Sequence, residues 1–310
     1  MNQSNSFINE QSESFPINKE GRMIKTTSSS SQQHFSCDLV EQSKKHVAFL
    51  QTLHLHSITI HKPSNDTFRR YSELWLPLVY QHVINNTSNT DQSNSSEGLI
   101  PPADIAWFWH CHRLAPYRYA KHVQSVFFSS KKNNNDMKNS SSSEQKEEAT
   151  SSTDKDLVVL DPEHPFVVQF EDNKDNLTFD AIQHSSAAEY TMRLWKQLYP
   201  SEPFFASIAS TANDDEKMDY SNHLLSGFDV IESCQRQATF LWQVSQVNFQ
   251  DDSFLQEGVE NYFKFMSLMK RDKDKPRFLV PTYQIDLMWH THMLSSIKDY
   301  HRDCLNLIQT

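Results

Sequence analysis

Glycine is scarce in this chain, with only four among 310 residues: Gly21, Gly98, Gly227 and Gly258. Phosphate-binding loops, dinucleotide fingerprints and nucleophile elbows all depend on closely spaced glycines. None of the four lies near another. The sequence therefore argues against nucleotide-driven chemistry and against a serine hydrolase.

Cysteine is equally rare, and long apolar runs are missing. Cys37, Cys111, Cys234 and Cys304 have no paired spacing, so they predict neither a disulfide framework nor a thiolate zinc site. Met1 is followed by polar residues instead of the basic start and apolar core of a secretory signal. No stretch reaches the roughly 20 apolar residues of a membrane span. We expect a soluble cytoplasmic protein with reduced thiols.

Positive charge is also in short supply. The chain has 29 Lys and Arg against 39 Asp and Glu, which gives a net charge of −10. A negative chain repels phosphate backbones and anionic lipid surfaces. We therefore predict no nucleic-acid partner and no membrane partner.

The sequence does contain a doubled motif. Trp109-His110-Cys111-His112 returns as Trp289-His290-Thr291-His292, and Leu99-Ile100-Pro101 returns as Leu279-Val280-Pro281, each offset by 180 positions (290 minus 110). The repeat extends upstream with an offset of 191 (262 minus 71). These upstream pairs are Phe49 with Phe240, Leu50 with Leu241, and Tyr71 with Tyr262. Such self-similarity indicates two related halves that arose by duplication.

Apolar spacing of three and four residues predicts helices along most of the chain. We predict helices over 37–56, from Phe68 past a kink at Pro77, from Pro101 to Ala115, from Pro116 through Val126, and over 187–198, 223–247 and 254–269, then from Thr282 and from Ile297. Short β-leaning runs at 157–160 and 166–170 predict a minor hairpin.

These patterns predict a mostly α fold of two related helical units with long disordered inserts. Residues 1–36 are expected to be a disordered tail, and residues 129–156 a low-complexity linker. The first helical repeat is placed at 37–128. The second is placed at 157–310, with a short extended segment at its start.

The paired histidines are candidate ligands. On one helix, His110 and His112 lie about 200° apart, as do His290 and His292, so a metal site would need one histidine from each half. Asp286 lies four residues before His290 and shares its face, where a carboxylate would fix the imidazole tautomer. In the first half Ala106 stands at the position of Asp286.

Three roles for these histidines are open: architecture, a metal or ligand site, and acid-base catalysis. In the first, they lie in a wet cleft or donate to backbone carbonyls. The large aromatic side chains are expected to pack in the core; these are Trp107, Phe108, Trp109, Trp242 and Trp289.

The frames at 102–114 (PADIAWFWHCHRL) and 279–292 (LVPTYQIDLMWHTH) resemble the glycine-rich domain-containing protein family. The resemblance covers about Cys37 to Cys304 apart from the inserts. It implies the fold unit, but no defined molecular activity. It also implies a link to development and stress responses. With four glycines in 310 residues, we expect neither the RNA-binding-like region nor the glycine-rich tail of some plant members. By analogy with Asp104, an acidic residue is expected where Gln284 stands.

We predict a non-enzymatic binding or scaffold protein whose partner is an unidentified protein or small molecule. No cofactor is predicted. The alternative is a metal-dependent protein or enzyme in which a divalent metal binds His110, His112, His290 and His292. The candidate cleft contains these four histidines together with Asp104, Trp109, Asp286 and Trp289.

Overall fold

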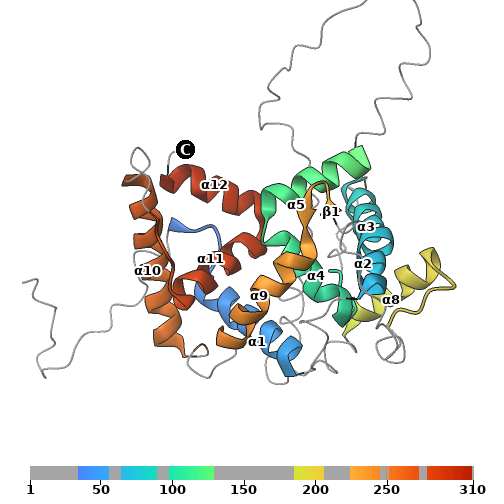
Figure 1. Cartoon of the computed structure of the whole chain (residues 1–310), viewed down its shortest axis with the longest axis horizontal. Coiled ribbons are helices and arrows are strands. Elements are labelled where there is room, and N and C mark those ends of the chain that lie inside the picture. The colour runs from blue at the N-terminus through green and yellow to red at the C-terminus, as the bar shows by residue number, and fades with distance from the viewer. Residues whose placement is uncertain are drawn as a thin grey trace, which may run out of the picture.

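The computed structural model describes residues 34–55, 64–88, 98–128, 185–205, 224–244, 249, 251–271 and 278–308. Helices dominate this part of the chain (Figure 1), so the predicted mostly α fold is confirmed. The elements are α1 (Leu39–Leu55), α2 (Asn65–Arg69), the π-helical η2 (Arg70–Trp75), α3 (Leu76–Ser88), α4 (Ala103–Arg113), α5 (Pro116–Val123), the π-helical η3 (Gln124–Phe128), α8 (Ser186–Leu198), β1 (Leu224–Leu225), β2 (Phe228–Asp229), α9 (Val230–Val244), α10 (Asp252–Arg271), α11 (Tyr283–Ser295) and α12 (Ile297–Ile308). No helix in these ranges is long and apolar enough to cross a bilayer.

The first helix of each half begins at an aspartate. The Asp38 carboxylate accepts hydrogen bonds from the backbone N–H groups of Val40 and Glu41, both at 3.1 Å. Asp229, 191 positions later (229 minus 38), accepts one from the N–H of Glu232 at 2.8 Å. A side-chain acceptor at a helix start satisfies donors that have no partner within the helix. The duplication thus includes the caps.

The second helix of the repeat differs between the halves. In the second half α10 runs without interruption. In the first half the same stretch is divided into α2, η2 and α3, and the N–H of Leu76 donates to the carbonyl of Tyr71 across a widened turn. Pro77 follows immediately, and its ring has no N–H to continue the regular bonding pattern. The irregularity predicted at Pro77 therefore lies mostly just before it.

The motif helices begin and end where the sequence predicts. Helix α4 starts after Pro102, and Pro116 opens α5. In the second half the Thr282 hydroxyl caps α11, and the Ser296 hydroxyl accepts from the N–H of Asp299 to cap α12. Different residues thus produce the same pair of consecutive helices.

One predicted helix starts too early. Residues Leu224–Asp229, predicted as the start of a helix, instead form the antiparallel hairpin of β1 and β2. Ser226 and Gly227 form its turn with φ values of 49° and 82°, the conformation favoured by tight hairpins. The hairpin predicted at 157–170 and the linker predicted at 129–156 lie outside the described residues, as does nearly all of the predicted tail.

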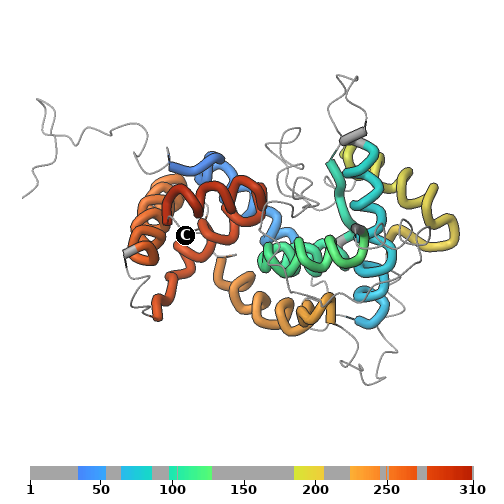
Figure 2. The backbone as a smooth tube through the Cα atoms, turned by 90° about the horizontal axis from the view of Figure 1, so that it is seen from above, coloured from blue at the N-terminus to red at the C-terminus, as the bar shows by residue number. Residues whose placement is uncertain are grey.

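The halves exchange their first helices. Helix α1 packs against α10 and α11 of the second half, while α9 packs most extensively against α4 of the first half and also contacts α1 and α11. Figures 1 and 2 show α1 and α9 between α10–α12 on one side and the first-half helices on the other. A single large core cluster of buried side chains draws on both halves. The two repeats are therefore interlocked.

Candidate functional site

The second histidine of each motif meets a tyrosine from the preceding long helix. The Nδ1 of His112 is 2.7 Å from the hydroxyl of Tyr71, and the Nδ1 of His292 is 3.1 Å from the hydroxyl of Tyr262. All four side chains are buried. Because the partners are repeat equivalents, the duplicated motif makes the same junction twice.

The motif tryptophans make a second duplicated contact. The indole N–H of Trp109 donates to the hydroxyl of Tyr119 at 3.4 Å, and that of Trp289 donates to the hydroxyl of Tyr300 at 2.9 Å. Both tyrosines lie on the helix that follows the motif helix. The tryptophan and second histidine thus tie each motif helix to its two neighbours in sequence.

The surroundings of the second histidine differ between halves. His112 lies beside His122, and burial with this neighbouring imidazole lowers the pKa of His112 to about 3. His292 instead places its Nε2 3.1 Å from the carboxylate of Asp303. Burial lowers the pKa of His292, while the hydrogen bond to Asp303 opposes this shift. Since a carboxylate requires a donor, Nε2 of His292 carries the proton and Nδ1 accepts from Tyr262.

The first histidines of the two motifs lie near each other, together with a histidine that the sequence analysis missed. His46 of α1 is 5.2 Å from His110 between ring centroids, and its Nδ1 is 2.9 Å from the Thr291 hydroxyl. Burial is the main cause that lowers the pKa of His110, and the neighbouring His290 adds to it. Burial also lowers the pKa of His290 to about 3. We call His46, His110 and His290 the central histidine group.

The predicted partner of His290 lies at the edge of this group. The carboxylate of Asp286 is 3.4 Å from Nε2 of His290, and burial raises the pKa of Asp286 to about 6. Nδ1 of His290 is buried and has no hydrogen-bond partner among the described residues. At neutral pH the pair is a carboxylate beside a neutral imidazole.

Helices α1 and α9 contact the motif helices α11 and α4 at the residue that lies between the two histidines of each motif. The Ser43 hydroxyl of α1 donates to that of Thr291 at 3.3 Å. At the equivalent place in the other half, the thiols of Cys111 and Cys234 are in hydrogen-bond contact, and both cysteines are free. Burial raises the pKa of Cys111, so it is a thiol at neutral pH. The sequence spacing gave no sign of this contact.

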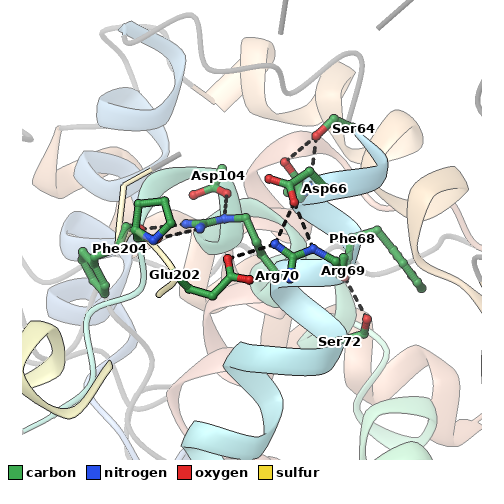
Figure 3. A network of polar contacts seen from close by, with 11 residues as sticks. Ser64, Asp66, Phe68, Arg69, Arg70, Ser72, Asp104, Glu202 and Phe204 are labelled. Carbon is green, nitrogen blue, oxygen red and sulfur yellow. Dashed lines mark hydrogen bonds and ion pairs between the residues drawn. The ribbon is translucent and has the colours of Figure 1, made fainter. Parts of the chain in front are cut away.

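Asp104 belongs to a different group of contacts. Its carboxylate is 2.9 Å from Nε of Arg70, and the exposed fractions of the two side chains are 10% and 2%. Arg70 also donates to the backbone carbonyls of Pro203 and Phe204 (Figure 3). Its guanidinium lies over the ring of Trp195. This ion pair anchors the segment that follows α8.

In the second half, neutral residues replace that ion pair. Gln284 stands at the position of Asp104 and Asn261 at that of Arg70; the Asn261 amide donates to the Gln284 carbonyl oxygen at 3.1 Å. Gln284 in turn donates to the backbone carbonyl of Phe254 at 2.8 Å. The acidic residue expected at 284 is therefore absent together with its cationic partner.

The structure thus divides the predicted site residues among four places: His110, His290 and Asp286 at the central histidine group; His112 and Trp109 in the first-half junction; His292 and Trp289 in the second-half junction; and Asp104 at the Arg70 anchor. Among the described residues, no three His, Cys, Asp or Glu side chains are arranged to hold a metal ion.

The comparison with protein families agrees with the duplication. A family model described as glycine-rich domain-containing protein-like matches residues 2–122 and 170–303. The chain belongs to this family. The two matched segments correspond to the two halves described above.

Two relatives from Arabidopsis thaliana share the same region. Glycine-rich domain-containing protein 2 is 29% identical over 277 residues, which covers 88% of this chain and 29% of the relative. Glycine-rich domain-containing protein 1 is 30% identical over 278 residues, covering 88% of this chain and 28% of the relative. The chain therefore spans less than a third of the length of these relatives. No solved structure matches.

One aromatic prediction for this family member is wrong. Trp242, expected in the core, is 54% exposed, whereas its neighbours Phe240 and Leu241 are buried. Successive residues of a helix point about 100° apart, so one surface position between buried ones is ordinary geometry. Trp107, Phe108 and Trp109 are buried as predicted, and Trp289 is partly buried.

Proposed function

We propose that this chain is a non-enzymatic cytoplasmic binding or scaffold protein whose doubled motif holds the helices in place. The observation that supports this most strongly is the repetition of two bonds in both halves, tyrosine to second histidine and tryptophan to tyrosine. Catalytic groups need access to a substrate, whereas structural groups need buried partners. The partners of His112, His292 and Trp109 are buried, and the partner of Trp289 is half-buried.

A binding role also agrees with the surface. Phe278 and Val280, just before α11, are 94% and 70% exposed. Trp242 on α9 is exposed as well. Exposed apolar side chains that form a contiguous patch are typical of partner-binding surfaces. A role in development or stress responses stays a prediction from the family resemblance.

The second candidate function is metal binding at the central histidine group. It is favoured by Nδ1 of His290, a buried potential ligand atom without a hydrogen bond among the described residues. Neutral imidazole nitrogens are good ligands for zinc and other transition metals. His290 would supply one ligand and Asp286 would orient it.

Metal content measured by mass spectrometry on untagged protein separates the two proposals. The variant His290→Ala removes the candidate ligand, and His122→Ala is the matched control, since His122 lies beside His112 instead. The binding proposal predicts no near-stoichiometric transition metal in any of the three proteins. Near-stoichiometric metal that His290→Ala loses and His122→Ala retains would overturn it.

A further inference from the structure

In the first half, α8 covers the residues that lead into the motif helix. The N–H of Ile100 donates to the hydroxyl of Thr191 at 3.0 Å. The Ile100 side chain packs in a buried cluster with Ala187 and Ala188, the small residues in the first turn of α8. The first motif helix therefore starts beneath an amphipathic helix.

Among the residues that the structure describes, no helix covers the same place in the second half. Val280 is the repeat equivalent of Ile100, yet it is 70% exposed, whereas Ile100 is 3% exposed. Phe278 is 94% exposed, and Tyr283 at the start of α11 is also exposed. A hydrophobic frame that is covered in one repeat and exposed in the other marks a surface that a further element can cover.

The charge at the repeat position of Arg69, next to the contact of Asn261 with Gln284 near the start of α11, is reversed. In the first half the Arg69 guanidinium binds the carboxylate of Glu202 through bonds of 2.9 and 3.0 Å, at the end of the segment that follows α8 (Figure 3). The repeat equivalent of Arg69 is Glu260 on α10 (69 plus 191). A helix that covers the second half in the way that α8 covers the first would therefore need a basic residue at the position equivalent to Glu202, so that it can pair with Glu260.

We propose that the second-half surface formed by Phe278, Val280, Tyr283 and Glu260 binds an amphipathic helix of a protein partner. The helix presents small residues to Val280 and carries a Lys or Arg near its C-terminal end for Glu260. This inference rests on the proposed binding function and names its surface and the class of partner.

A synthetic peptide tests the surface directly. The probe copies residues 185–205 with the change Glu202→Arg and carries a fluorescent label. The unchanged 185–205 peptide is the control. Fluorescence anisotropy on the full chain should show saturable binding of the Arg peptide, about fivefold tighter than the control, since one surface charge pair contributes on the order of 1 kcal/mol.

Two variants locate the binding. Val280→Asp should weaken the Arg peptide by at least about tenfold, because a charge would be desolvated beneath the helix. Glu260→Arg should reverse the preference so that the unchanged peptide binds more tightly. Because Val280 is exposed and Glu260 is partly exposed, both variants should keep the circular dichroism spectrum and melting temperature of the parent.

Four results would overturn the proposal. The first is no saturable binding up to about 1 mM. The second is binding that Val280→Asp leaves unchanged, and the third is a preference for the unchanged peptide, as displacement of α8 from the first half would give. The fourth is self-association that Val280→Asp abolishes, since the surface would then bind a second copy. The metal measurement tests the proposed function, and the peptide measurement tests this surface. Failure of one proposal can therefore be distinguished from failure of the other.

Discussion

The ion pair between Arg70 and Asp104 permits a quantitative prediction. Burial raises the pKa of Asp104 more than Arg70 lowers it, so the pair itself contributes little net stability. Removing one partner is different, because it leaves a nearly fully buried guanidinium without its counter-charge. Arg70 would keep its bonds to the carbonyls of Pro203 and Phe204. We therefore expect Asp104→Asn to lower the free energy of unfolding by about 3 kcal/mol.

The neighbouring arginine is the matched control. Arg69 also binds two carboxylates, those of Asp66 and Glu202, but all three side chains are substantially exposed. Exposed ion pairs contribute about 1 kcal/mol or less after screening by solvent. Arg69→Met should therefore cost far less than Asp104→Asn. Urea unfolding followed by tryptophan fluorescence measures both values.

A double variant completes the test. Arg70→Asn with Asp104→Gln copies the neutral pair of Asn261 and Gln284 in the second half. The double variant should cost about 2 kcal/mol less than the sum of the single changes Arg70→Asn and Asp104→Gln, because it leaves no buried charge without a partner. The reasoning is refuted if Asp104→Asn costs no more than Arg69→Met, or if the two single changes are additive.

Two further predictions concern the motif. Burial holds the pKa of His112 and of His290 at about 3, so the unfolded chain binds more protons than the folded chain below pH 6.5. The free energy of unfolding should therefore fall by about 1.4 kcal/mol per pH unit for each histidine as the pH drops from 6.5 toward 3. Urea titrations at several pH values measure this slope. The raised pKa of Asp286 opposes this only between about pH 6 and 3.8, and constant stability from pH 7 to 5 would contradict the assignment. Tyr71→Phe and Tyr262→Phe should each cost about 1–2 kcal/mol in the same assay, because each leaves a buried imidazole nitrogen without its hydrogen bond, and a cost in only one half would show that the junctions are not equivalent.

Local signals in the sequence predict much of the fold. Pro102 and Pro116 mark two helix starts correctly, and the hydroxyls of Thr282 and Ser296 mark the equivalent starts in the second half. Each depends on a few neighbouring residues, and such short-range chemistry is legible without the tertiary structure. The offset of the repeat likewise identifies Tyr71 and Tyr262 as equivalent before their role is visible.

The exchange of first helices could not be predicted. The sequence shows that α1 and α9 are equivalent, but either helix could pack on its own half or on the other with the same apolar stripe. Through this exchange His46 reaches Thr291, which lies between the two motif histidines of the other half. The pairing of Arg70 with Asp104 is likewise a long-range contact with no local signal.

The sequence contains a local signal for the hairpin at Leu224–Asp229. Ser226-Gly227 is a recognised turn dipeptide. Its flanking apolar residues also continue the spacing of the helix that follows, and this spacing predicts an earlier helix start. The positive φ angles at both turn positions decide between the two.

The most direct test of the central claim is the nitrogen-15 spectrum of the histidine rings, recorded at about pH 7 with and without excess zinc. If the central histidine group is architectural, the rings of His46, His110 and His290 are neutral, and their signals keep the same positions when zinc is added. Signals of His110 and His290 that shift together and saturate at one zinc per chain would contradict the account.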